Sequence, residues 1–190
     1  MFRSSMLLIV LVLLSGCGSL HVMSHVPLST MSRLSSLKLA DIDPLHLRVA
    51  ARMPEHIEPR KDGVKVTITM ATKQEFILEP AFEQHELSAL SRYHRPGTRL
   101  WSFRLSAADR ERLQQTRAAA GGPGKNTGQN QVSIAASVDA CRRGMLGAKP
   151  LPTSTFLRTD ATGFFVLADE LDLRSIVPER DLAANVPACD

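Results

Sequence analysis

The chain has 190 residues, of which 44% are hydrophobic and 22% are charged, and its formal net charge at pH 7 is +4. This length suits one domain and is short for two. The composition excludes a wholly disordered chain and a multi-span membrane protein. The 11 glycines and 11 prolines occur without the repeat that collagen or a solenoid requires.

The N-terminus has the pattern of an export signal. Arg3 supplies a positive charge, and the nine apolar residues Met6–Leu14 follow. A helix that spans a bilayer needs about 20 apolar residues, so this run is too short for a permanent span. It ends in Leu14-Ser15-Gly16-Cys17, an aliphatic residue, two small residues and a cysteine, which resembles the lipobox of bacterial lipoproteins.

The resemblance implies that residues 1–16 are a signal peptide and that Cys17 carries the lipid. Two or three acyl chains, such as palmitate, would hold the mature chain permanently on a membrane. Gly18 stands where an aspartate favours the inner membrane in two-membrane bacteria, so the resemblance implies an outer-membrane location facing the periplasm. An ordinary signal peptide that is cut elsewhere is the alternative.

Residues 17–43 are rich in serine and small residues and are interpreted as a lipid-anchored tether. Four apolar side chains within it offer an alternative, because they could form a helical turn or short strand that docks onto the domain. They are Met31, Leu34, Leu37 and Leu39. Residues 44–190 are predicted to form one β-rich periplasmic domain.

Alternation of apolar and polar residues predicts about seven short strands in this domain. The predicted strands cover residues 45–51, 64–70, 75–78, 101–105, 132–138, 155–158 and 164–167. Each predicted strand has one face of polar side chains, which favours antiparallel pairing. Strands and helices do not alternate along the sequence as they do in βαβ folds. The fold class is therefore predicted as mainly β, an antiparallel β-sandwich of the Ig-like type. The alternatives are an open barrel or an α+β sheet with one helix.

One helix is predicted between two strands. Ser106 and Asp109 have capping-box spacing, residues 110–120 are good helix formers, and the glycine-rich run 121–124 stops them. Leu113 is the only large aliphatic residue in this helix, so we expect a surface insertion.

Cys141 and Cys189 remain after lipidation of Cys17, and an even remainder in an oxidising compartment favours one disulfide between them. The alternative is two unpaired thiols. The bond would hold the C-terminal tail on the domain and contribute roughly 4 kcal/mol in the chain-entropy model.

A basic and aromatic segment is the best candidate for a binding surface. Its four arginines alternate with the only tyrosine and the only tryptophan of the chain, and they are Arg92, Arg95, Arg99 and Arg104. Guanidinium groups pair with phosphate or carboxylate and stack on rings, so this segment could bind an anionic polymer, a lipid headgroup or an acidic partner. The alternative is that Trp101 belongs to the core and the arginines line a wet face. Arg142-Arg143 is a second, weaker basic spot.

Other motifs predict no site. The loop 121–128 lacks the glycine and hydroxyl spacing of a phosphate-binding loop, and His21 and His25 have no third metal ligand nearby. His85 and His94 are interpreted as solvated, and so is the acidic cluster of residues 169–172. We therefore predict no catalytic residue, no metal and no cofactor. Nucleic acid is disfavoured as a partner because no dense Lys/Arg stripe is present.

The sequence thus predicts an envelope-anchored lipoprotein that is not an enzyme and acts as a binding, adaptor or assembly accessory module. Its predicted partners are membrane lipid, through acylated Cys17, and an envelope protein. The alternative is a binder of an anionic envelope polymer or lipid through the arginine and aromatic surface. A periplasmic hydrolase is the weakest hypothesis, since no GxSxG or Ser/His/Asp pattern is found.

Overall fold

The computed structural model describes residues 27–39, 42–69, 73–81, 88–120, 133–160 and 162–190. Its elements in chain order are α3 (Leu28–Ser36), β1 (Arg48–Pro54), β2 (Ile57–Thr69), β3 (Lys73–Pro80), η3 (Ser91–Tyr93), β4 (Thr98–Leu105), α5 (Ala107–Ala120), β5 (Ser133–Arg142), β6 (Pro152–Thr159), β7 (Thr162–Asp172), α6 (Leu173–Ile176) and α7 (Glu179–Asn185).

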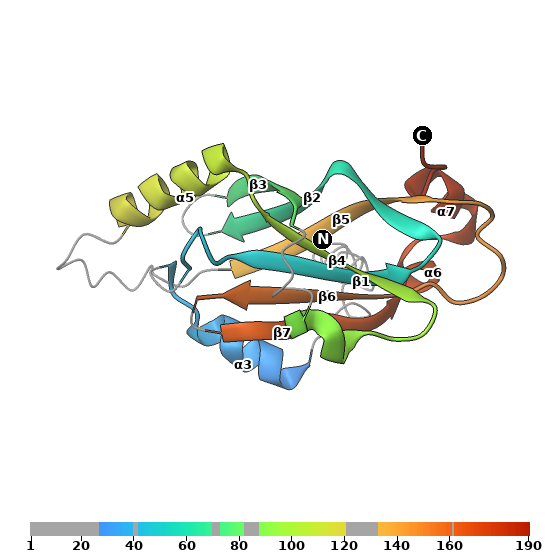
Figure 1. Ribbon diagram of the computed structural model, residues 1–190, viewed down its shortest axis with the longest axis horizontal. Helices are drawn as coiled ribbons and strands as arrows, with labels where there is room; N and C mark the ends of the chain where they lie inside the picture. The colour runs from blue at the N-terminus through green and yellow to red at the C-terminus, as the bar shows by residue number, and fades with distance from the viewer. Residues whose placement is uncertain (1–26, 40–41, 70–72, 82–87, 121–132, 161) are drawn as a thin grey trace, which may run out of the picture.

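The strands form one seven-stranded sheet in the order β5-β2-β3-β4-β1-β6-β7 (Figure 1). Every pairing between neighbours is antiparallel. Strand β3 joins the two halves of the sheet, because residues 73–77 pair with β2 whereas residues 78–80 pair with β4. The sheet is curled, since α3 contacts both edge strands, β5 and β7.

The mainly antiparallel β fold and the inserted helix are therefore confirmed, and all seven predicted strand segments overlap an observed strand. The finer prediction of an Ig-like sandwich is not confirmed. A sandwich consists of two sheets packed face to face, whereas here β3 links the two groups of strands by hydrogen bonds into one continuous sheet.

Strand β1 differs from its prediction, because both of its faces are buried. Val49, Ala51 and Met53 belong to the main core, which lies on one side of the sheet. On the other side Ala50 packs in a second cluster with Leu90, Phe156 and Phe164. The segment that contains η3 covers this second side, and Tyr93 packs on the Phe156 ring with the ring centroids 4.4 Å apart (Figure 1, green).

Strand β2 also departs from its prediction, because it begins at Ile57, seven residues before the predicted start at residue 64, and runs through Asp62 and Gly63. Its pairing with β5 shifts register between Pro59 and Val64, which marks a β-bulge. Asp62 has a φ of 58°, and a Cβ on Gly63 would lie 3.0 Å from the Cβ of Asp139. The bulge therefore requires a residue without a side chain at position 63.

Helix α5 follows β4 as predicted, and Ser106 is its cap. The Asp109 amide donates a hydrogen bond to the Ser106 hydroxyl over 3.1 Å. Leu113 is fully buried in the main core, and the Arg112 guanidinium lies 4.4 Å from the centroid of the Phe76 ring. Hydrogen bonds between Asp109 and the Ile77 amide, Arg112 and the Glu75 carbonyl, and Thr116 and Gln74 also hold this largely polar helix on β3.

Helix α3 lies in the segment predicted as a tether. It is placed at the seam between the two sheet edges, where the buried Thr30 hydroxyl donates to the Val166 carbonyl of β7 (Figure 1). After the helix, Leu37, Leu39 and Ile42 are buried in the main core. The alternative interpretation, in which this segment docks onto the domain, thus describes residues 28–39. Residues 17–26, 40 and 41 lie outside the described residues.

The C-terminal tail is attached to the C-terminal end of β5. A disulfide joins Cys141 to Cys189, with the Cα atoms 5.0 Å apart. Beside it the Arg142 amide donates to the Pro187 carbonyl over 2.8 Å, and the Cys189 amide donates to the Arg142 carbonyl over 3.0 Å. Leu182 of α7 is buried in the main core, so the tail is part of the domain.

Candidate functional site

The four arginines of the predicted binding surface do not share one face. Side chains alternate along β4, so Arg99 lies on the side of Trp101, whereas Arg104 lies on the opposite side. Arg99 is over the Trp101 ring and 3.4 Å from a Glu58 carboxylate oxygen, while the Arg104 Nε donates to Glu79 over 3.0 Å.

Arg95 is exposed and donates to the carbonyl of its neighbour His94. Trp101 is half-buried and packs against the main core, which matches the alternative interpretation of this residue. The segment therefore does not form a single arginine and aromatic surface, and its members act separately.

Arg92 lies instead in a cleft of about 680 Å³ between α3, η3 and β7, which we call the α3 cleft. Its guanidinium is 4.7 Å from the centroid of the Tyr93 ring and donates to the Phe164 carbonyl over 2.8 Å. Arg33 also lines this cleft, and its guanidinium is 5.5 Å from the centroid of the Phe165 ring. The cleft is lined by Pro27, Ser29, Thr30, Arg33, Arg92, Tyr93, Gly163, Phe164, Phe165 and Val166.

The electrostatic character of the α3 cleft is positive. None of the described residues that line it is acidic, and within the described part of the chain neither Arg33 nor Arg92 forms an ion pair with a carboxylate. A guanidinium has five N–H donors, and Arg92 uses one of them in its hydrogen bond to the Phe164 carbonyl. The remaining donors on two arginines can bind an anion that enters the cleft.

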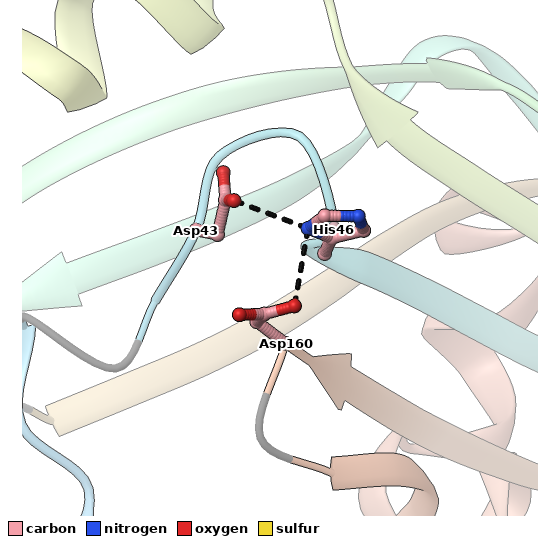
Figure 2. Close-up of side chains that lie close together, drawn as sticks. All are labelled: Asp43, His46 and Asp160. Carbon is pink, nitrogen blue, oxygen red and sulfur yellow. Dashed lines mark hydrogen bonds and ion pairs between the residues drawn. The ribbon is translucent and has the colours of Figure 1, made fainter.

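A second cluster combines one histidine with two aspartates (Figure 2). The Nδ1 atom of His46 lies 3.1 Å from the Oδ2 atom of Asp43 and 3.2 Å from the Oδ1 atom of Asp160. Asp43 and His46 belong to the turn before β1, and Asp160 to the hairpin between β6 and β7. The sequence did not predict this cluster, because His46 and Asp160 are 114 positions apart and only the fold brings them together.

Asp43 is ionised across the neutral range. The Leu45 amide, which donates to Asp43 over 2.8 Å, lowers the pKa of this carboxyl. The hydrogen bond and charge of His46, together with the charge of Arg117, lower the pKa further, against a partial desolvation that raises it. Asp43 therefore presents a negative charge to the His46 ring.

The acidic cluster of residues 169–172 has a structural role. Arg52 of β1 is buried, with 4% of its side chain exposed, and donates to Asp169, Glu170, the Ser154 hydroxyl and the Tyr93 carbonyl. These partners satisfy a cation that would be costly to bury alone. Asp172 caps α6 through the Arg174 amide, over 3.1 Å.

In the second basic spot Arg143 donates to Glu58 over 2.7 Å, and this contact lowers the pKa of Glu58 and raises that of Arg143. His94 is exposed, as expected of a solvated residue. Cys17, His21, His25, His85 and the loop 121–128 lie outside the described residues.

No family model, curated protein or solved structure matches this chain. Within the part of the chain that the structure describes, no helix has the length and apolar character needed to cross a membrane.

Proposed function

We propose that the chain is a lipid-anchored envelope protein that acts by binding or as an adaptor rather than by catalysis. We further propose that its α3 cleft binds the anionic headgroups of the membrane to which Cys17 is attached. The run Met6–Leu14 and the lipobox Leu14–Cys17 support the anchor. The headgroup proposal is carried by one observation, the pair of guanidinium groups of Arg33 and Arg92 in a cleft without acidic lining among the described residues.

Chain length supports a membrane as the source of the anion. Pro27 lines the α3 cleft, and ten peptide units separate it from Cys17. Because an extended chain spans at most about 3.5 Å per residue, the cleft lies within about 35 Å of the lipidated residue. On α3, Leu28 and Met31 expose 84% and 42% of their surfaces, which suits contact with the interfacial region of a bilayer.

Arginine chemistry supports a phosphate headgroup. The planar guanidinium fork matches two phosphate oxygens, and rings beneath it restrict its orientation without consuming its donors. Each arginine near an anionic surface contributes about 1 kcal/mol, so two contribute roughly 2 kcal/mol, or a factor of about 30 in affinity.

Co-sedimentation with lipid vesicles tests the headgroup proposal. The mature chain with Cys17→Ser, which carries no acyl group, should bind vesicles that contain phosphatidylglycerol and not vesicles of phosphatidylcholine. Arg33→Gln/Arg92→Gln should weaken this binding about 30-fold. The control is Arg95→Gln, which removes an exposed arginine outside the cleft and should bind as the parent does. Equal losses in the two variants would contradict a role for the cleft.

Competition distinguishes the possible sources of the anion. Binding that free inorganic phosphate abolishes at low concentration would assign the cleft to a small anion. Retention on an anionic polymer, with no preference among the vesicles, would assign it to the polymer.

The anchor is tested separately in cells. Wild-type chain should incorporate radioactive palmitate and fractionate with membranes, whereas Cys17→Ser should do neither. Equal labelling of the two proteins would refute the lipobox interpretation. Chemical crosslinking in intact cells, followed by mass spectrometry, would identify any protein to which the domain is an adaptor.

A further inference from the structure

The Asp43, His46 and Asp160 cluster places two carboxylates on the same nitrogen of one imidazole (Figure 2). In its neutral form an imidazole nitrogen carries at most one hydrogen, so Nδ1 cannot donate a full hydrogen bond to both aspartates. Each carboxylate also repels the other at this separation. A cation seated between the three groups would interact favourably with all of them.

The turn before β1 holds the first two ligands in place. The Oδ1 atom of Asp43 accepts the Leu45 amide over 2.8 Å, which leaves Oδ2 directed at the ring. The Asp43 carbonyl accepts the amides of His46 and Leu47 over 3.0 and 2.9 Å, and Leu47 is fully buried. The turn is therefore fixed to the core on one side and presents its two polar side chains on the other.

The third ligand comes from the hairpin between β6 and β7. Thr159 is buried, and its hydroxyl lies 3.0 Å from that of Thr162 across the turn. This contact fixes the two residues that flank the turn carrying Asp160. The cluster thus joins two turns that the fold positions independently.

The two distances that join the carboxylate oxygens to the imidazole nitrogen fit a small divalent cation. Four tetrahedral ligands at 2.0–2.1 Å from zinc are about 3.3 Å from one another. The two distances to the His46 Nδ1 atom are 3.1 and 3.2 Å, and all three ligand atoms lie within 4.8 Å of one another.

We propose that Asp43, His46 and Asp160 form a binding site for a divalent transition-metal ion of the zinc type. One imidazole nitrogen favours such an ion over Mg²⁺ and Ca²⁺, which prefer ligand sets made of oxygen alone. The three protein ligands lie at the surface, so water completes the coordination. The ion connects the turn before β1 to the hairpin between β6 and β7. This inference is independent of the lipid anchor and of the α3 cleft.

Calorimetric titration with Zn²⁺ alone tests the site, using the full chain in detergent after treatment with a chelator. We expect one ion per chain, and millimolar Mg²⁺ or Ca²⁺ should not displace it. Asp160→Asn should weaken binding about tenfold or more, and His46→Gln should weaken it at least as much. Asp160 is exposed, so its variant retains the fold, which circular dichroism would verify.

Matched variants separate this site from other histidines and aspartates. Asp62→Asn changes another exposed aspartate in an irregular segment, and His94→Gln changes another exposed histidine, so both should bind Zn²⁺ as wild type does. Binding that survives His46→Gln but disappears in His21→Gln/His25→Gln would overturn the proposal. A titration without saturable heat would overturn it as well.

Discussion

Reduction of the Cys141–Cys189 disulfide gives the sharpest stability prediction for this domain. The bond attaches the tail to the C-terminal end of β5, where hydrogen bonds between Arg142, Pro187 and Cys189 also hold it. These hydrogen bonds and the buried Leu182 remain when the disulfide is broken. We therefore expect the reduced protein to keep its fold and to lose mainly the constraint on its unfolded chain.

The size of the loss follows from the length of the closed loop. The two cysteines are 48 positions apart. In the chain-entropy model a loop of this length contributes about 4 kcal/mol, and removing a native disulfide from a small secreted domain typically costs about 2–5 kcal/mol. The free energy of unfolding of the reduced chain should thus be about 4 kcal/mol below that of the oxidised chain.

Urea unfolding monitored by the fluorescence of Trp101, the only tryptophan, measures this difference. The oxidised protein is compared with the same protein in a reductant, which lacks the bond but keeps both cysteine side chains. It is also compared with Cys141→Ala/Cys189→Ala, which lacks both the bond and the side chains. Single substitutions should match the double one, because either removes the bond. A difference below about 1 kcal/mol between oxidised and reduced protein would refute the entropic reasoning.

Three further predictions concern side chains that the fold holds in place. Leu113→Ala should lower the free energy of unfolding by about 2–5 kcal/mol in the same assay, because Leu113 is fully buried where α5 meets the core. Arg52→Met should lower it by about 1–3 kcal/mol, since the buried bonds to Ser154 and Tyr93 are lost while Asp169 stays half exposed to water. Folding lowers the pKa of Asp43, so its stabilisation is complete above the ordinary value of 3.8 and disappears as the pH falls through the lowered pKa. Acid titration of stability should therefore show the difference between wild type and Asp43→Asn shrinking below pH 3.8.

The strands and the start of α5 could be predicted from the sequence, because they depend on residues that are neighbours along the chain. Apolar residues alternate in the seven strands, and Ser106 lies three residues before Asp109 at the start of α5. Strand β1 shows where such reasoning stops. The alternation places Arg48 on a solvent-facing side, but it is buried, and the next arginine on that side, Arg52, binds carboxylates more than 100 residues away in β7.

The candidate sites were harder to predict from the sequence, because they also depend on residues that are far apart along the chain. Arg33 lies in a serine-rich segment with weak helical periodicity, and nothing in the local sequence shows that it lines the same cleft as Arg92. Asp43 and His46 are three residues apart, which is a weak signal alone, and Asp160 joins them only through the β6–β7 hairpin. Local patterns therefore predicted the strands, and long-range pairing determined the sites.

The position of α3 has a consequence for the time course of folding. Thr30 and the Val166 carbonyl that it contacts are 136 positions apart, so the first helix among the described residues meets the last strand, β7. Closure of such a distant contact is slow relative to hairpin formation, and the β7 border stays uncovered until it happens. During this interval a neighbouring chain can pair with the edge strand β7 in place of α3, so the chain is exposed to aggregation until its two ends meet.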